Sequence, residues 1–286
     1  MCRFVAYKGV PIFIDELLYK PTNSLIHQSY SAQEREGLVN GDGFGVGWYA
    51  PEIEASPAVF VSVRPAWSNR NLRQISSKIR TNCLFAHVRD ATISAVSEAN
   101  CHPFCFGPYL MMHNGDVGDF IALKRSLREG LTDKSYNWID GQTDSQHLFA
   151  LFLDRIESHQ NYLKADEIAS LLEETISSLL ELQRRLKLSE PSYLNLAVTD
   201  GRSMVATRYV SDPKLESATL YFSEGSHYEC HDGVCVMDKS DQNERSVLIV
   251  SEKLTEAKGD WSEVPPQNIV IVEEDLSVRV RKMEVG

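Results

Sequence analysis

The chain opens with the stretch MCRFVAYKG, residues 1–9, and the remaining sequence is best interpreted outward from it. The stretch is mostly apolar and is ended by Gly9 and Pro11, which predicts a strand. A thiol is a useful nucleophile only as a thiolate, and a nearby base helps to form it. If Met1 is removed, Cys2 gains a free α-amine whose ordinary pKa of roughly 7.7–8.0 suits it to accept the thiol proton. Taken alone, a cysteine that merely lies near the start of a strand is the favoured interpretation.

Short runs of apolar and β-branched residues, typical of strands, recur on both sides of a central helical region. Three segments in that region have apolar residues at helical spacing, at residues 119–127, 144–156 and 166–186. The order strands, helices, strands favours an α+β layered fold over a doubly wound parallel sheet. The helices would cover sheets built from both ends of the chain, so we expect one domain over residues 1–286. The expected strands are 44–50, 59–63, 83–88, 109–113, 194–198, 205–209, 220–223, 247–251, 269–272 and 278–280.

The bulk composition is that of a soluble globular protein. Of the 286 residues, 43% are hydrophobic and 24% are charged, and the formal net charge is −11. This acidity argues against nucleic acid as the main partner, because phosphate binding needs a basic surface. No apolar run is long enough to cross a membrane, and no signal peptide is recognisable at the start, so we expect a cytoplasmic protein without membrane attachment. In that compartment the six cysteines are expected to be reduced thiols.

Two short segments carry groups that suit carbonyl chemistry. Arg89 follows an apolar strand and has the planar fork of donors that binds a carboxylate in a bidentate manner. An exposed arginine at a strand end is the plainer interpretation. Asn114 and Gly115 place a side-chain amide beside a backbone N–H, a pair that can stabilise an oxyanion. Since Asn-Gly is also the commonest hairpin pair, a simple turn remains open.

A third segment, at residues 143–146, opens a predicted helix. Thr143 and Gln146 have the spacing of a capping box, and Asp144 would lie in the first turn, where the helix dipole favours a carboxylate. This explains all three residues structurally. The alternative is that Asp144 faces an ammonium group of a ligand.

The order of these segments is more specific than any one of them. Cys2, then Arg-x-Ala-Thr at 89–92, His-Asn-Gly at 113–115 and Thr-Asp-Ser-Gln at 143–146 together resemble the class II glutamine amidotransferase family. The resemblance implies a four-layer αββα N-terminal-nucleophile fold. It also implies that Cys2 is the nucleophile, that Asn114 and Gly115 form the oxyanion hole, and that a γ-glutamyl substrate is bound through its α-carboxylate and α-amine. The residues expected to bind these two groups are Arg89 and Asp144, with Thr92 near the substrate.

Other stretches resemble a stand-alone branch of this family, which includes γ-glutamyl hydrolases of ergothioneine synthesis and the amidotransferase-like component of glutathione breakdown. These stretches are residues 1–7, 42–49, 100–104 and 251–255. The resemblance implies hydrolysis of a γ-glutamyl amide through a glutamyl thioester, with no cofactor. No synthase domain follows, so a glutaminase that supplies ammonia to a partner subunit is one alternative. A catalytically silent relative that binds a γ-glutamyl ligand is another.

Two cysteine–histidine groups and one glycine-rich run complete the candidates. Cys101, His102 and Cys105 form the first group, and Cys230, His231 and Cys235 form the second. Neither group has the compact spacing of a zinc site, so we expect buried or loop thiols and no metal. The glycines between residues 42 and 47 are interpreted as strand bulges rather than as points where backbone approaches a substrate.

Overall fold

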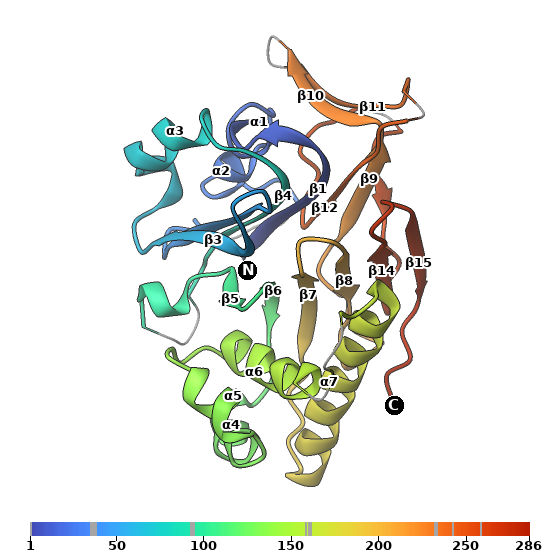
Figure 1. Ribbon diagram of the computed structural model, residues 1–286. Coiled ribbons are helices and arrows are strands. Elements are labelled where there is room, and N and C mark those ends of the chain that lie inside the picture. The colour runs from blue at the N-terminus through green and yellow to red at the C-terminus, as the bar shows by residue number, and fades with distance from the viewer. Residues whose placement is uncertain are drawn as a thin grey trace.

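Two antiparallel β-sheets lie face to face between two layers of helices (Figure 1). The computed structural model describes residues 2–34, 39–91, 95–157, 159, 162–231, 234–241, 243–257 and 259–286. Within this part of the chain, one sheet has the strand order β13-β9-β12-β1-β4-β2-β3 and the other the order β15-β14-β8-β7-β6-β5. A separate hairpin, β10–β11, extends from the edge of the molecule (Figure 1).

Both sheets combine strands from the two ends of the chain, as the order of elements predicted. The larger sheet contains β1 (Arg3–Phe13), β2 (Phe44–Ala50), β3 (Glu54–Ser62), β4 (Arg80–Val88), β9 (Tyr221–Gly225), β12 (Ser246–Val250) and β13 (Ser262–Glu263). The smaller sheet contains β5 (Phe104–Phe106), β6 (Tyr109–Asp116), β7 (Tyr193–Thr199), β8 (Met204–Arg208), β14 (Asn268–Val272) and β15 (Val278–Lys282). The hairpin consists of β10 (His227–His231) and β11 (Val234–Asp238).

The helices divide into a large group and a small one. The outer face of the smaller sheet is covered by α4 (Phe120–Glu129), α5 (Asp133–Trp138), α6 (Asp144–Ile156) and α7 (Ala165–Arg185) (Figure 1). Short helices lie on the larger sheet, namely α1 (Asp15–Leu18), α2 (Leu25–Gln28) and α3 (Arg70–Ser76). Two short 3-10 turns, Ala66–Ser68 and Glu98–Asn100, complete the helical elements of the described residues.

Three apolar cores correspond to the three boundaries between layers. Leu148 and Ile176 belong to the core under the large helices, and Val5 and Leu17 belong to the core under the short helices. The central core, between the sheets, includes Phe4 of β1 and residues of β6, β8 and β12. This is the α+β, αββα arrangement that the family resemblance implied, and it is confirmed.

The glycines of β2 correct the bulge interpretation. Residues 44–48 of this strand pair with β4 without any shift in register. A Cβ added to Gly45 would lie 2.2 Å from the carbonyl oxygen of His102, and one added to Gly47 would lie 2.7 Å from Leu110 Cδ1. Glycine is needed here because neighbouring segments approach the strand closely. The approaching group is protein, including the backbone at His102.

No helix in the described residues is both long and apolar enough to span a bilayer.

Candidate active site

Cys2 lies directly before β1, at the end of the strand where Arg3 pairs with Val88 of β4. The N–H of Asp90 donates to Cys2 Sγ at 3.4 Å, and the thiol lies 3.7 Å from the carbonyl oxygen of Asp90. Burial raises the pKa of the Cys2 thiol, and the hydrogen bond from Asp90 opposes this rise. Burial therefore favours the protonated thiol, and a proton acceptor is needed before it can attack a carbonyl.

Arg89 is buried immediately after β4, one residue from the backbone that contacts Cys2. Its N–H donates to the carbonyl of Gly43 at 2.8 Å. Its Nη1 lies 3.5 Å from the carbonyl oxygens of both Asp42 and Ala95. The backbone around Arg89 thus holds the guanidinium near the end of the strand, where its charge opposes the rise that burial causes in the pKa of the Cys2 thiol.

Asn114 and Gly115 lie within β6, which is three residues longer than the sequence predicted. They pair with β7 at Asn195 and Leu194, so the hairpin-turn interpretation is wrong. Asn114 is buried, and its Oδ1 has no hydrogen-bond partner among the described residues. A Cβ added to Gly115 would lie 1.9 Å from the carbonyl oxygen of Tyr193, so no larger residue fits in this backbone.

Strand alternation places Asn114 on the face of β6 that meets the larger sheet, and Cys2 directly precedes β1 of that sheet. Phe4 of β1 and Met112 of β6 belong to the core between the sheets, and residues two apart share a face. The strands β1 and β6 are in contact. A direct polar contact also joins the sheets, since His87 Nε2 lies 3.2 Å from the carbonyl oxygen of His113.

Asp144 is the first residue of α6, and its carboxylate faces the end of β6. Its Oδ2 accepts from the N–H of Val117 at 2.8 Å, and its Oδ1 accepts from the N–H of Ser145 at 2.8 Å. Only half of the expected capping box forms. Thr143 Oγ1 accepts from Gln146 N at 3.1 Å, but Gln146 Oε1 accepts instead from the N–H of Gly141.

Hydrogen bonds connect Arg89 to the segment that precedes Asp144. Ala95 accepts from both Arg89 Nη1 and Asn100 Nδ2, the latter at 2.8 Å. Asn100 Oδ1 in turn accepts from the N–H of Gln142, two residues before Asp144, at 2.9 Å. The structure thus links the segments of Arg89 and Asp144, and those of Cys2 and Asn114. Thr92 falls outside the described residues.

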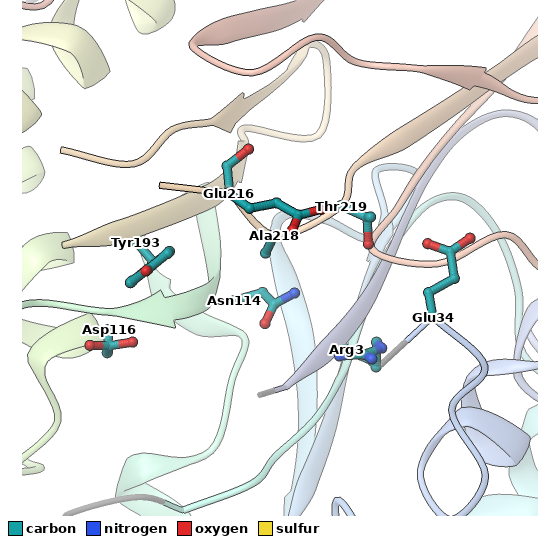
Figure 2. Close-up of a pocket in the computed structure, with 9 residues that line it drawn as sticks. Arg3, Glu34, Asn114, Asp116, Tyr193, Glu216, Ala218 and Thr219 are labelled. Carbon is teal, nitrogen blue, oxygen red and sulfur yellow. The ribbon is translucent and has the colours of Figure 1, made fainter. Parts of the chain in front are cut away.

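A cavity of about 330 Å³ opens beside Asn114 (Figure 2). It is lined by Arg3, Glu34, Asn114, Asp116, Tyr193, Glu216, Ser217, Ala218 and Thr219. Arg89, Asp144 and the Cys2 side chain do not line it, and its connection to Cys2 is through the neighbouring residue Arg3. Apart from Asn114, no sequence argument singled out these residues. Arg3 alone carried a signal, because it belongs to the N-terminal stretch that the branch resemblance quoted.

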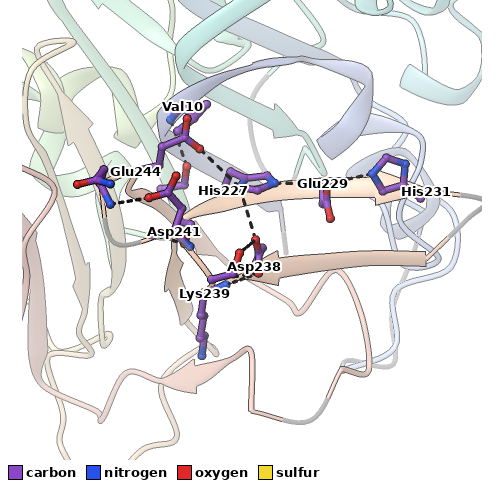
Figure 3. Close-up of polar contacts among 12 residues, drawn as sticks. Val10, His227, Glu229, His231, Asp238, Lys239, Asp241 and Glu244 are labelled. Carbon is purple, nitrogen blue, oxygen red and sulfur yellow. Dashed lines mark hydrogen bonds and ion pairs between the residues drawn. The ribbon is translucent and has the colours of Figure 1, made fainter.

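The cysteine–histidine groups differ from the expectation in one respect. Cys230 and Cys235 form a disulfide across the β10–β11 hairpin, so the prediction of reduced thiols is wrong for this pair. Cys101 and Cys105 are free, and Cys101 is buried. On the hairpin, Glu229 contacts both His227 and His231 (Figure 3). Within the residues that the structure describes, no group of three His, Cys, Asp or Glu side chains is arranged to hold a metal ion.

The family of glutamine amidotransferases class-II matches residues 20–284, so the chain belongs to this family. The resemblance drawn from the motifs is thereby confirmed. The chain is 36% identical to the probable glutamine amidotransferase DUG3 of Saccharomyces cerevisiae, over 95% of this chain and 82% of the relative. It is 25% identical to the gamma-glutamyl-hercynylcysteine sulfoxide hydrolase of Mycolicibacterium smegmatis, over 95% of this chain and 96% of the relative.

A solved structure of a glutamine aminotransferase class-II domain protein from Silicibacter pomeroyi has the same fold. It covers 98% of this chain and 99% of its own, with a TM-score of 0.67 and 24% sequence identity. At this identity the match supports the fold alone.

Proposed function

We propose that the chain, acting as one domain over residues 1–286, hydrolyses the γ-glutamyl amide bond of a small molecule with Cys2 as nucleophile. One observation carries the proposal. The thiol of Cys2 lies against the backbone that directly follows Arg89, and β1, which begins at the next residue, contacts β6, the strand that carries Asn114. Membership of the class II family supports the reaction class. A relative named as a gamma-glutamyl hydrolase supports the bond that is cleaved.

The two charged residues would recognise the glutamyl end of the substrate. Arg89 would bind the α-carboxylate through its fork of donors. Asp144 would bind the α-ammonium, since a carboxylate oxygen has lone pairs beyond those that bind the N–H groups of Val117 and Ser145. Holding both groups directs the γ-carbonyl toward Cys2 and makes the attack effectively intramolecular.

The chemistry then proceeds in two balanced steps. The α-amine of Cys2, free after removal of Met1, accepts the thiol proton, and sulfur forms a bond to the γ-carbon. The tetrahedral oxyanion is stabilised by the side-chain amide of Asn114 and the N–H of Gly115. As the C–N bond breaks, the α-ammonium returns its proton to the leaving amine. Water then cleaves the glutamyl thioester, which yields glutamate and the free thiol.

The size of the cavity beside Asn114 favours a leaving group larger than ammonia. Small-molecule sites usually occupy roughly 300–1,000 Å³. A cavity of about 330 Å³ is far more than ammonia needs and suits an amine of dipeptide size. We therefore favour a γ-glutamyl conjugate over glutamine as the substrate.

Glutamate release tests the function. The panel contains glutamine, glutathione and γ-glutamyl-cysteine conjugates, and the protein is first shown by intact mass to lack Met1. Wild type is compared with Cys2→Ala, with Asn114→Ala, and with Cys105→Ala as a matched control at another half-buried thiol. We expect no turnover without Cys2, a roughly 100- to 1000-fold lower kcat without Asn114, and no change in the control.

The outcomes separate the alternatives. Release from glutamine alone would favour a glutaminase that supplies a partner chain with ammonia. Release from none of the substrates would favour the silent relative. Equal turnover by wild type and Cys2→Ala would exclude the thiol mechanism.

A further inference from the structure

A buried ion pair lies directly against the backbone of Cys2. Arg3 Nε donates to Glu252 Oε2 at 2.9 Å, and the two side chains are 7% and 1% exposed. Arg3 Nη1 donates to the carbonyl oxygen of Cys2 at 3.0 Å. One guanidinium therefore joins the proposed nucleophile to a carboxylate that lies 249 positions away in the chain.

Glu252 and its neighbour are in turn held firmly. Glu252 Oε1 accepts from Asn23 Nδ2 at 3.0 Å and from the N–H of Gln33 at 2.7 Å. Ser251 Oγ accepts from the N–H of Phe4 at 2.9 Å, and the N–H of Ser251 donates to the carbonyl of Phe4 at 3.1 Å. Residues 251–252 thus hold residues 3 and 4 through an ion pair and two hydrogen bonds, and Arg3 in turn binds the carbonyl of Cys2. We call Arg3, Ser251 and Glu252 the N-terminal clamp.

A chain terminus frays unless it is tied down, and a nucleophile on a terminal residue needs a fixed position. Cys2 lies outside the ladder of β1, which begins at Arg3, so the pairing of the sheet alone does not fix it. A buried ion pair is weak evidence for stability, because two desolvated charges often do no better than an apolar pair. Because Arg3 of this pair also binds the carbonyl of Cys2, the pair can fix the position of that residue.

We propose that the N-terminal clamp positions Cys2 for attack and that Glu252 is a positioning residue of the reaction. The inference rests on the proposed role of Cys2. Glu252 also neutralises the Arg3 cation beside the nucleophile. Among the residues that the structure describes, the charged or titratable groups near the Cys2 thiol also include Arg89, Asp90 and Cys101, and Glu34 faces the clamp from the cavity that Arg3 lines.

Removal of the charge on Glu252 should have an electrostatic signature. In Glu252→Gln the Arg3 cation loses the carboxylate that its Nε contacts, while Glu34, which lines the same cavity as Arg3, is unchanged. A nearby positive charge favours the thiolate and disfavours the ammonium, so both groups on Cys2 lose protons at lower pH. The pH profile of thiol alkylation should move to lower pH.

The experiment compares Glu252→Gln with Glu173→Gln. Glu173 is a fitting control, because it is a buried glutamate on α7 that forms a bidentate pair with Arg281 at 2.7 and 2.8 Å. Three quantities are measured: kcat and KM for glutamate release, the pH midpoint for alkylation of Cys2 by iodoacetamide, and the melting temperature. For Glu252→Gln we expect kcat to fall roughly 10- to 100-fold with little change in KM, and the midpoint to fall. Glu173→Gln should change the melting temperature alone.

A second variant keeps the proposal open to refutation if Glu252→Gln does not fold. Arg3→Lys keeps the charge pair, but one ammonium lacks the fork that reaches both Glu252 and the carbonyl of Cys2. We expect its kcat to fall as well. If either folded variant keeps wild-type kcat and the wild-type alkylation midpoint, the clamp is a structural element only. The alkylation readout needs no substrate, so it tests the clamp even if the proposed hydrolysis fails.

Discussion

Two groups of similar sequence, Cys-His followed by a second cysteine, differ in the exposure of their histidines. Around residue 102 the group lies inside the molecule, where the ring of His102 packs 4.2 Å from that of His87 and 4.5 Å from that of Phe104. Around residue 231 the group lies on the β10–β11 hairpin, with its two cysteines joined and the His231 side chain 78% exposed.

The surroundings of each group, rather than its residue types, determine its protonation and its oxidation state. Burial raises the pKa of the Cys101 thiol to about 11 and lowers the pKa of His102 well below its usual range, so both stay neutral. On the hairpin, Cys230 and Cys235 have no ionisable thiol, because they are oxidised. The interior group should therefore be sensitive to packing and to protonation, while the hairpin group should tolerate change.

The largest effect should follow from crowding the interior group. In Gly45→Ala the new Cβ would lie 2.2 Å from the carbonyl oxygen of His102, which forces backbone apart. We expect a loss of about 3 kcal/mol or more in the free energy of unfolding, measured with urea. Gly130→Ala is the control, because its nearest new contact is 3.5 Å. A Gly45→Ala protein as stable as wild type would show that the segment at residues 101–103 is loosely held.

Removing the hairpin disulfide should have a smaller effect, and only on stability. The bridge joins residues five apart, so the loop-entropy model gives about 2 kcal/mol for the double variant Cys230→Ser, Cys235→Ser. Tyr228 and Met237 still pack the hairpin against the core under the short helices, so the fold should persist. Glutamate release should be unchanged. A fall in kcat would instead reveal coupling between the hairpin and the candidate site.

The same contrast explains which elements could be predicted from the sequence. The strand at Phe44–Ala50 and the helix at Asp144–Ile156 were predicted to the residue, because their apolar patterns are regular. The hairpin was missed, since His227–His231 alternates weakly and is rich in polar residues. The short helices α1 to α3 have four to seven residues, too few for a periodic signal.

The candidate site shows the same limit. Its principal residues could be named in advance because each lies in a local motif whose order along the chain is specific. The N-terminal clamp could not, since Arg3 and Glu252 are 249 positions apart and nothing local pairs them. Cavities likewise depend on several loops, such as residues 216–219 beside β6, whose approach has no periodic signal.

The next largest effect should be a loss of folding stability in acid, caused by the buried histidines His87 and His102. Burial lowers the pKa of His87 to about 3 and that of His102 strongly, so both remain neutral in the folded state. In the unfolded state each binds a proton below about pH 6.5, so stability is lost as the pH falls, by up to about 1.4 kcal/mol per pH unit for each. His102→Phe keeps the ring and removes one titration. Its urea-unfolding free energy should fall less steeply between about pH 5.5 and 4.5 than that of wild type. An unchanged slope would mean that His102 takes up a proton in the folded protein.

The smallest effect should come from the exposed histidine. His231 Nε2 lies 2.9 Å from Glu229 Oε2, and this contact is the largest cause that lowers the pKa of the Glu229 carboxyl. An exposed pair of this kind contributes little, because both groups are well hydrated without it, so His231→Ala should change the free energy of unfolding by less than about 0.5 kcal/mol. Carboxyl titration by NMR should nevertheless show the pKa of Glu229 rising toward its ordinary value. A stability loss as large as that of the disulfide variant would mean that the hairpin depends on its polar face, and the contrast with the interior group would then fail.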